Sequence, residues 1–565
     1  MKTHTKYIAL IFMTLLYAAC QNEPDTETVD TEEDGVTSLY DGLEFDMPEV
    51  KEASFPDNGM LITDFKAIGD GLFMNTEAIN KTINEVAEKG GGKVVIPRGV
   101  WLTGPITLKS NINLHLEEGA LLIFSDDKSL YPLVETSFEG LNTYRTQSPI
   151  SGKNLENIAI TGSGIIDGNG DAWRPVKKSK MTSSQWKSLV KSGGVLSEDE
   201  KTWYPSESYK KANALTENFN VPPFKTRQEF EEVKEFLRPV MVSLVECKKV
   251  LLDGPTFQNS PAWNIHPLMC EDVIIRNLTV RNPWYSQNGD GLDLESCKNA
   301  LIYNNNFDVG DDAICIKSGK DKDGRDRGVP TENVIVKNNI VYHGHGGFVV
   351  GSEMSGGVKN VHVSRCTFIG TDVGLRFKST RGRGGVVENI YISDIDMINI
   401  PTDAIRFNLF YGGQSPILEE DQEAPEIDEE AVAVTEETPS FRNIYMKNIN
   451  VTGSETAAFM QGLPEMKLKN INLENANFQS ENGITLIDAD GISFKNVKVA
   501  HNKGSAMTVY NGTDLKLDNV TLKESEKASL RVFGQSKGIV VNNSNFGEEN
   551  TSSSKEVPAE AVKYQ

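Results

Sequence analysis

The sequence predicts an all-β chain wound as a single-stranded parallel β-helix, a solenoid in which each coil of backbone adds short strands to the coil before it. Three observations carry this prediction. The chain has 565 residues, more than one globular core usually holds. A pattern of alternating apolar residues, a polar residue that is often Asn, and two more apolar residues recurs from about residue 249. Gly, Asn and Asp turns separate these short segments, and no helical pattern intervenes.

The spacing of the pattern indicates one coil per repeat. Successive repeats start 21 to 34 residues apart, except for one step of 54. That long step is either one coil with an insertion or two coils of which one is degraded. Residues at equal offsets are expected to stack above one another. Marking the residue before each first apolar position places the coils at 249, 272, 299, 333, 360, 389, 443, 470, 491, 514 and 538.

The segment before the coils predicts a cap. Residues 75–88 carry Ile79, Ile83 and Val86 on one helical face, and the glycines at 90–92 end the pattern. We expect this helix to cover the open N-terminal end of the solenoid. The first strands are then expected at 94–97 and 112–116.

The domain organisation follows from these elements and from two segments that break the rhythm. Residues 173–237 contain three Trp residues and predict an ordered lobe, whereas 414–440 hold ten acids and no Lys or Arg and predict a solvated loop. The expected parts are a signal peptide at 1–19, a lipid-anchored acidic tether at 20–55, the β-helix domain at 56–550 with insertions 173–237 and 414–440, and a flexible tail at 551–565.

The N-terminus predicts export. Lys2 and Lys6 precede an apolar run at 8–16, which is too short to span a membrane and is typical of a cleaved signal. Cys20 follows Ala18-Ala19, which resembles a bacterial lipoprotein signal, so we expect lipidation at Cys20. A plain secretory signal and an uncleaved anchor helix are the alternatives. The expected location is the cell envelope, with a lipid as the only membrane contact.

Composition excludes some functions. The formal charge of -23 argues against a nucleic-acid binder.

The cysteines after Cys20 are odd in number and match no metal-binding spacing, so we expect buried thiols inside the solenoid. They are Cys247, Cys270, Cys297, Cys315 and Cys366.

Aligning the coils predicts one cluster of reactive side chains. The strands 291–296, 313–318, 347–352 and 374–379 fall at equal offsets. Adjacent coils lie about 4.8 Å apart, so acids at these offsets crowd together, and crowding separates their pKa values into those of a proton donor and a base. Each motif alone is an ordinary turn or a solvated face; their convergence indicates a glycosidase site. The cluster comprises Asp290, Asp311, Asp312, His345, Arg376 and Lys378.

These residues resemble glycoside hydrolase family 28, the polygalacturonases. The resemblance extends over roughly residues 60–550, and Gly289 and Phe377 replace the family's threonine and isoleucine. It rests on Asn288-Gly289-Asp290-Gly291, Gly310-Asp311-Asp312, Gly344-His345-Gly346 and Arg376-Phe377-Lys378, with 65–71 and 90–97 matching the superfamily's opening.

The resemblance implies a right-handed β-helix and an inverting hydrolase of α-1,4-galacturonosidic linkages in pectin. Asp311 would be the general acid, Asp290 and Asp312 would activate the water, and His345 would tune or relay protons. Arg376 and Lys378 would bind the substrate carboxylate, and Tyr411, Lys317 and Glu353 complete the expected substrate-binding set. The segment 347–357 resembles bacterial exo-acting members, and the lobe 173–237 is expected to close one end of the groove.

Other readings remain open from the sequence. A hydrolase of rhamnogalacturonan or decorated pectin would share the fold and family. A calcium-dependent pectate lyase or a non-catalytic carbohydrate-binding β-helix would share only the solenoid. We expect a monomer that needs no cofactor and no metal and whose partner is a pectic polysaccharide or oligogalacturonide.

Overall fold

The computed structural model describes residues 39–216, 220–411, 430–523 and 528–565. The chain divides into two units, Met1–Leu43 and Glu44–Gln565, and only residues 39–43 of the first are described. The predicted signal peptide, Cys20 and most of the second predicted insertion lie outside the described residues. Among the helices of the described part, none is long and apolar enough to cross a membrane.

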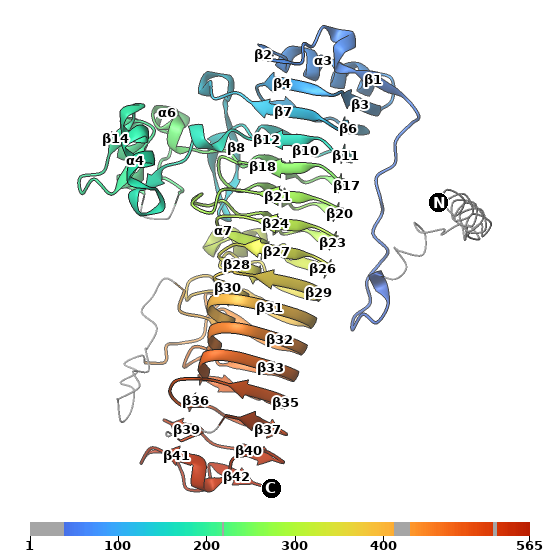
Figure 1. Cartoon of the computed structure of the whole chain (residues 1–565). Coiled ribbons are helices and arrows are strands. Elements are labelled where there is room, and N and C mark those ends of the chain that lie inside the picture. The colour runs from blue at the N-terminus through green and yellow to red at the C-terminus, as the bar shows by residue number, and fades with distance from the viewer. Residues whose placement is uncertain (1–38, 217–219, 412–429, 524–527) are drawn as a thin grey trace, which may run out of the picture. The chain divides into compact units, whose positions relative to one another are not determined.

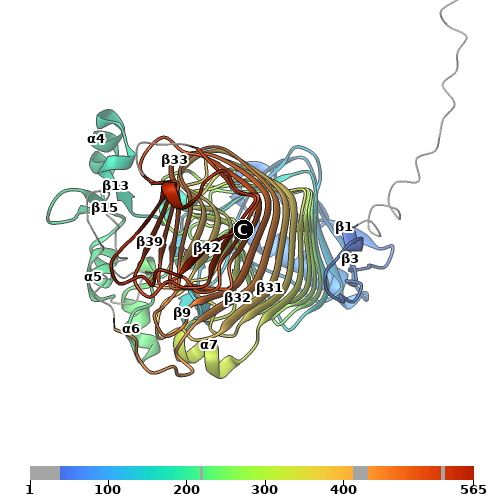
Figure 2. The same ribbon diagram turned by 90° about the horizontal axis from the view of Figure 1, so that it is seen from below.

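The second unit is a right-handed parallel β-helix, as the sequence predicted (Figure 1). Its strands stack in three columns, which Figure 2 shows from one end. The first column begins with β1 (Gly59–Leu61) and continues with β3 (Gly92–Ile96), β6 (Ile112–Leu116), β11 (Glu156–Gly162), β17 (Lys248–Asp253), β20 (Glu271–Arg276), β23 (Lys298–Tyr303), β26 (Thr331–Lys337) and β29 (Val358–Ile369). The second has β4 (Gly99–Thr103), β7 (Ala120–Phe124), β12 (Ile165–Asp167), β18 (Thr256–Gln258), β21 (Thr279–Arg281), β24 (Asn306–Asp308) and β27 (Ile340–His343). The third has β5 (Ile106–Thr107), β10 (Ile150–Lys153), β16 (Val242–Val245), β19 (Ile265–Leu268), β22 (Leu292–Glu295), β25 (Asp312–Lys317), β28 (Gly346–Val350) and β30 (Val373–Lys378).

Farther along, the strands lengthen until one strand follows most of a coil. Three such strands, β31 (Val386–Asn408), β32 (Ser440–Gln461) and β33 (Leu468–Ile487), pair along their lengths. Shorter strands finish the stack: β34 (Ala489–Asp490), β35 (Ser493–Ala500), β36 (Met507–Tyr510), β37 (Lys516–Asp518), β38 (Thr521–Leu522), β39 (Leu530–Phe533), β40 (Ile539–Asn542), β41 (Thr551–Ser553) and β42 (Val562–Tyr564). Short 3₁₀ turns lie at Ile62–Phe65, Lys128–Leu130, Gly170–Ala172, Lys178–Lys180, Lys234–Phe236 and Glu548–Asn550.

The residue that marks each coil has a backbone reason to recur. All eleven marked residues have φ between 52° and 69°, the left-handed region that Asn, Asp and Gly tolerate best. The asparagines among them also bond to one another from coil to coil: Nδ2 of Asn333 donates to Oδ1 of Asn299 at 3.1 Å, and Asn360 donates to Asn333 at 3.2 Å. The marked position is therefore a left-handed turn, and the asparagines that occupy it in successive coils form a ladder.

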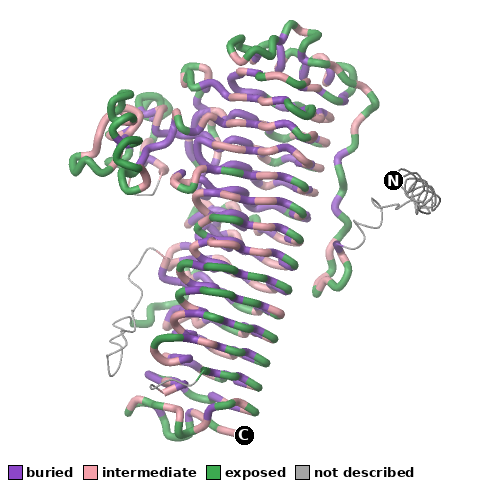
Figure 3. Tube along the Cα trace, in the orientation of Figure 1, coloured by how far each residue is buried: buried purple, intermediate pink, exposed green. Residues whose placement is uncertain are grey.

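The core is one apolar column inside the coils. Equivalent positions such as Val334, Val361, Ile390 and Ile444 are fully buried and stack in register. Figure 3 shows buried residues in successive coils along the solenoid. At the N-terminal end, α3 (Thr76–Glu88) buries its apolar face on this column, which confirms the predicted cap. All five predicted buried thiols are indeed buried and unpaired.

Two additions lie between strands of the second and third columns. A hairpin of β8 (Leu133–Phe138) and β9 (Leu141–Thr146) precedes β10. The predicted lobe follows β12 and packs against that hairpin through an apolar cluster that joins Leu133 to Tyr209 and Phe236. The lobe contains β13 (Val176–Lys177), α4 (Ser183–Lys191), β14 (Val195–Leu196), β15 (Thr202–Tyr204), α5 (Glu207–Leu215) and α6 (Arg227–Glu232). One further helix, α7 (Asp321–Arg327), follows β25. Strand β2 (Asp70–Met74) pairs with β4 and is the first strand of the second column, as β1 is of the first.

The structure decides three predictions about segment boundaries. The 54-residue step is one coil with an insertion, because Asn389 and Asn443 lie at the same register position of β31 and β32. The tail prediction for 551–565 was wrong, since β41 pairs with β39 and β42 with β40 to complete the last coil. The tether prediction was wrong for residues 44–55, which lie extended with Val50 and Ala53 buried and with Glu52 paired to Arg276 at 2.9 Å.

Candidate active site

The register predicted from the sequence is the register of the third column. Asp293 lies opposite Cys315, Cys315 opposite Val349, and Val349 opposite Arg376. This stacking places the loops before β22, β25 and β28 beside one another, next to the outward side chains of β30. A cavity of about 330 Å³ opens there, at the lower end of the size range of small-molecule sites. It is lined by all the predicted catalytic and substrate-binding residues: Asp290, Asp311, Asp312, His345, Arg376, Lys378, Lys317, Glu353 and Tyr411.

Three carboxylates form the centre of the cavity. One oxygen from each of Asp290, Asp311 and Asp312 lies within 4.8 Å of the other two. Asp312 also accepts hydrogen bonds from Lys378 Nζ at 2.7 Å and from Arg376 Nη1 at 3.1 Å. The negative charge of Asp312 is therefore compensated by two side chains of β30.

The three aspartates differ in proton affinity. Burial, followed by the neighbouring Asp312, raises the pKa of Asp311 above its ordinary value. Burial and the charges of Asp293 and Asp311 raise the pKa of Asp290 well above its usual range. Burial acts in the same direction on Asp312, but Lys378 and Arg376 outweigh it and hold its pKa below the ordinary value. Adjacent carboxyls thus have pKa values shifted in opposite directions, the arrangement that acid–base cleavage requires.

His345 has a partner that the sequence analysis missed. Its Nδ1 bonds to a carboxylate oxygen of Asp372, which lies one coil further at the same offset, as the pairing of Gly346 with Val373 shows. This hydrogen bond raises the pKa of His345. The coil alignment already contained the signal, because it superimposes residue 372 on residue 345.

Lys317 and Glu353 line the cavity but bind each other. Lys317 Nζ donates to Glu353 Oε2 at 2.7 Å, lies 3.5 Å from Asp293 and sits over the ring of Trp263. Both side chains are less than one tenth exposed. Trp263 also lines the cavity, and Asp293 contacts the pair through Lys317 without lining the cavity; the sequence did not predict either residue.

Tyr411 stands beside the two cations of β30. The Lys378 ammonium lies 5.0 Å from the centre of its ring, and the Arg376 guanidinium lies 5.7 Å from it. The tyrosine thus flanks the positive side of the cavity, the position expected for a residue that contacts an anionic substrate.

The tip of the hairpin forms one wall of the cavity. Glu139, at the tip between β8 and β9, lines the cavity and accepts a 2.6 Å hydrogen bond from Asn220 of the lobe. Asn220 Nδ2 also donates to Asn288, in the loop that carries Asp290. The backbone N–H of Lys320 donates to the Gly140 carbonyl, and a Cβ at Gly140 would come within 2.5 Å of that nitrogen. The hairpin tip therefore forms this wall of the cavity, and the lobe supports the tip.

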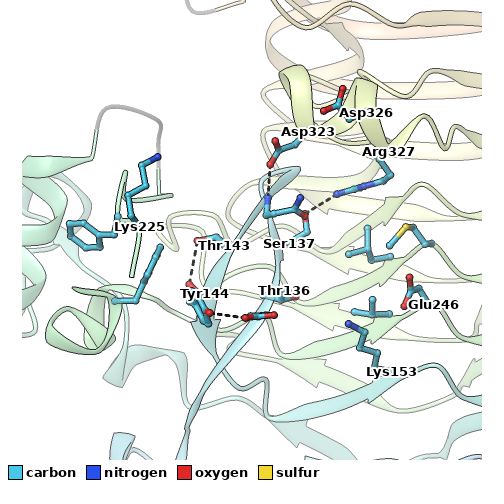
Figure 4. A pocket seen from close by; sticks show the side chains of 17 residues that line it. Thr136, Ser137, Thr143, Tyr144, Lys153, Lys225, Glu246, Asp323, Asp326 and Arg327 are labelled. Carbon is cyan, nitrogen blue, oxygen red and sulfur yellow. Dashed lines mark hydrogen bonds between the residues drawn. The ribbon is translucent and has the colours of Figure 1, made fainter. Parts of the chain in front are cut away.

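The hairpin also covers a second, larger cavity, of about 700 Å³ (Figure 4). Its lining includes Lys153, Glu246, Asp323 and Arg327 but none of the three aspartates of the first cavity. Asp323 accepts a 3.0 Å hydrogen bond from the Asn142 backbone, and Arg327 donates to Ser137. These bonds fasten the hairpin to α7, and the second cavity shares no lining residue with the first.

Comparison with known proteins places the chain. Residues 228–469 match the model of glycosyl hydrolases family 28. The structure of a hyperthermoactive exopolygalacturonase from Thermotoga maritima is 32% identical, covers 81% of this chain and 95% of its own, and superimposes with a TM-score of 0.63. The chain belongs to glycosyl hydrolase family 28. A family 28 exopolygalacturonase from Yersinia enterocolitica, 21% identical, shares the fold over 81% of this chain and 78% of its own, with a TM-score of 0.58.

Curated relatives agree with this family 28 assignment. A probable polygalacturonase from Vitis vinifera is 29% identical over 60% of this chain and 60% of its own. An exo-poly-alpha-D-galacturonosidase from Dickeya chrysanthemi is 29% identical over 63% of this chain and 58% of its own. The chain thus spans about three fifths of the length of these two relatives.

Proposed function

We propose that this family 28 protein is an exo-acting polygalacturonase, which hydrolyses α-1,4-galacturonosidic linkages with inversion. The observation that carries the proposal is the trio of aspartates with one ionised member, Asp312, bound to Lys378 and Arg376. An inverting glycosidase needs one carboxylic acid for the leaving oxygen and one carboxylate for the attacking water.

The proton affinities assign the roles. Asp311, whose pKa is raised, keeps the proton that the leaving oxygen receives. Asp312, whose pKa is lowered, accepts a proton from the water. Asp290, with one buried carboxyl oxygen that has no hydrogen-bond partner among the described residues, orients that water. His345, whose pKa is raised by its hydrogen bond to Asp372, stabilises the ionised form of Asp311 after transfer.

The substrate is recognised by charge. Arg376 and Lys378 bind Asp312 with part of their donor capacity, and both line the cavity, so they are placed to hold the carboxylate of the sugar next to the cleaved bond. A positive groove on an acidic protein can still concentrate an anionic polymer, because charges beyond a Debye length of about 8 Å are screened.

Exo action follows from the closed end. The hairpin tip with Glu139 occupies the groove beside Asp290, whereas the other side continues toward β31 past Arg376. A chain enters from the open side, and its terminal sugar reaches the wall. Products are then single units rather than mixed oligomers.

The experiment is digestion of polygalacturonic acid, with and without EDTA, followed by chromatography and by absorbance of unsaturated products. The proposal predicts galacturonate monomer from the first time point, no absorbance rise and no effect of EDTA. Mixed oligomers would make the enzyme endo-acting. Absorbance or loss of activity with EDTA would favour a lyase and would assign the three-carboxylate cluster to a metal ion. The control is Asp311→Asn, which keeps the fold and removes the proposed acid.

We also propose that the protein is exported and anchored to the cell envelope through a lipid on Cys20, and that it is a monomer. The support is the sequence around Ala18-Ala19-Cys20. Metabolic labelling with a palmitate analogue is expected to label the wild-type protein and not Cys20→Ser. A labelled variant would place the lipid elsewhere, and an unlabelled wild type would mean a plain secretory signal.

A further inference from the structure

A second arginine extends the cationic side of the groove by one coil. Strand β30 pairs with β31 so that Arg376 lies opposite Arg406 and Lys378 lies opposite Asn408. Arg406 lines a cavity of about 370 Å³ that shares His345, Arg376, Lys378 and Tyr411 with the catalytic cavity. The two cavities are therefore consecutive parts of one groove, on the side away from the hairpin.

Arg406 is held in position by two neighbours and keeps N–H donors for a further partner. Its Nη1 donates to Asp403 Oδ2 at 2.5 Å, and its guanidinium lies 5.2 Å from the centre of the Phe459 ring on the next coil. The Asp403 carboxylate is buried, whereas one third of the Arg406 side chain is exposed. A guanidinium has five N–H donors, and within the described part of the chain its hydrogen bond to Asp403 uses one.

The charge around Arg406 suits an anion. The cavity contains the side chains of Arg376, Lys378 and Arg406, and its acid, Asp372, is engaged by His345. Successive coils lie about 4.8 Å apart along the groove. A chain that continues from the carboxylate held by Arg376 and Lys378 therefore passes Arg406 next. Thr402 lines the same cavity, and its hydroxyl donates to the Asp372 carbonyl at 2.5 Å.

We propose that Arg406 forms an additional carboxylate subsite, which binds the third sugar unit of an oligogalacturonide counted from the closed end of the groove. This inference rests on the proposed function. Asp403 and Phe459 act as positioning residues, which fix the guanidinium from two sides. The subsite makes the enzyme prefer chains of three or more units, since a dimer ends before it reaches Arg406.

The test compares kcat/KM on digalacturonate and trigalacturonate for the wild type and Arg406→Gln. Loss of a charge-assisted contact is expected to lower kcat/KM on trigalacturonate about 10- to 100-fold, through KM, and to change it less than about twofold on digalacturonate. The matched control is Arg442→Gln, another arginine paired to an acid, Glu388, but on the first column. The control is expected to leave both substrates unaffected.

Equal loss on both substrates, or no loss on either, would overturn the subsite. If Arg406→Gln does not fold, Phe459→Leu provides the test, because it removes one support of Arg406 and is expected to weaken trigalacturonate selectively but less. Absence of that selectivity would also overturn the inference. A wild type that cleaves neither oligomer would instead refute the proposed function, and the subsite with it.

Discussion

The role of Asp312 can be tested by removing one of the cations that keep it ionised. Lys378→Met replaces the ammonium 2.7 Å from Asp312 Oδ2 with an apolar group of similar length. At that distance, an effective dielectric constant of about 20 gives an attraction of about 6 kcal/mol, which is an upper bound because Arg376 remains at 3.1 Å. Opposite charges at such distances shift a carboxyl pKa by about 1–3 units.

The sign follows from the folded state. The pKa of Asp312 is lowered by Lys378 and Arg376, so the carboxylate stays ionised at acidic pH. Without Lys378 the pKa rises, and the acid limb of the kcat/KM profile is expected to move up by about 1–3 pH units. Substrate binding also weakens, but a loss of binding alone lowers the profile without moving its limb.

The assay is release of reducing sugar from trigalacturonate at closely spaced pH values, for the wild type, Lys378→Met and the control Arg442→Gln. Circular dichroism confirms that each variant is folded over the same range. An acid limb that does not move in Lys378→Met would refute Asp312 as the base and would transfer that role to Asp290, whose pKa depends mainly on burial and on Asp293.

Three further predictions follow from the same structure. Asp311→Asn is expected to lower kcat by about 10²- to 10⁴-fold with little change in KM, measured by steady-state kinetics; a loss below tenfold would exclude it as the general acid. Asp372→Asn removes the hydrogen bond that raises the pKa of His345. The NMR titration of His345 and the alkaline limb of the activity profile are therefore expected to move to lower pH together. Movement of only one of them would show that His345 titration does not control activity. Asn333→Ala is expected to lower the free energy of unfolding by about 1–3 kcal/mol, because Ala disfavours a φ of 59° and removes the hydrogen bonds of the asparagine ladder. Asn333→Gly tolerates that φ and is expected to lower the free energy of unfolding less. Urea denaturation that ranks the two variants in the opposite order would contradict the ladder account.

The solenoid was predictable because its information is periodic. Each marked residue, from Lys249 to Gly538, needs a left-handed turn and is followed by side chains that enter the core, so chemistry and position recur together. The same register also predicted the site, because residues at equal offsets in different coils lie close together whatever the conformation of the loops between them. Asp372 was predictable in the same way, because it lies at the same offset as His345 in the next coil.

The features that escaped prediction lie where the repeat gives no information. The contact of Gly140 with Lys320 joins a hairpin and a helix that both interrupt the coils, and no offset relates them. Residues 44–55 and 551–565 were wrongly predicted as flexible because they are polar. Burial of Val50 and Ala53, and backbone pairing by β41 and β42, depend on the surface that the solenoid presents and not on local hydrophobicity.

The central claim is that Asp311 and Asp312 act as an acid and a base on a chain end. The nearest oxygens of the trio lie within 4.8 Å of one another, closer than the separation of about 6.5–9.5 Å usual for inverting pairs, so the stereochemistry is a demanding test. The measurement is proton NMR of polygalacturonate in the first minutes of digestion, before the anomers equilibrate. The account predicts free galacturonate that appears first as the β anomer. Appearance of the α anomer would contradict it and would make one aspartate a nucleophile.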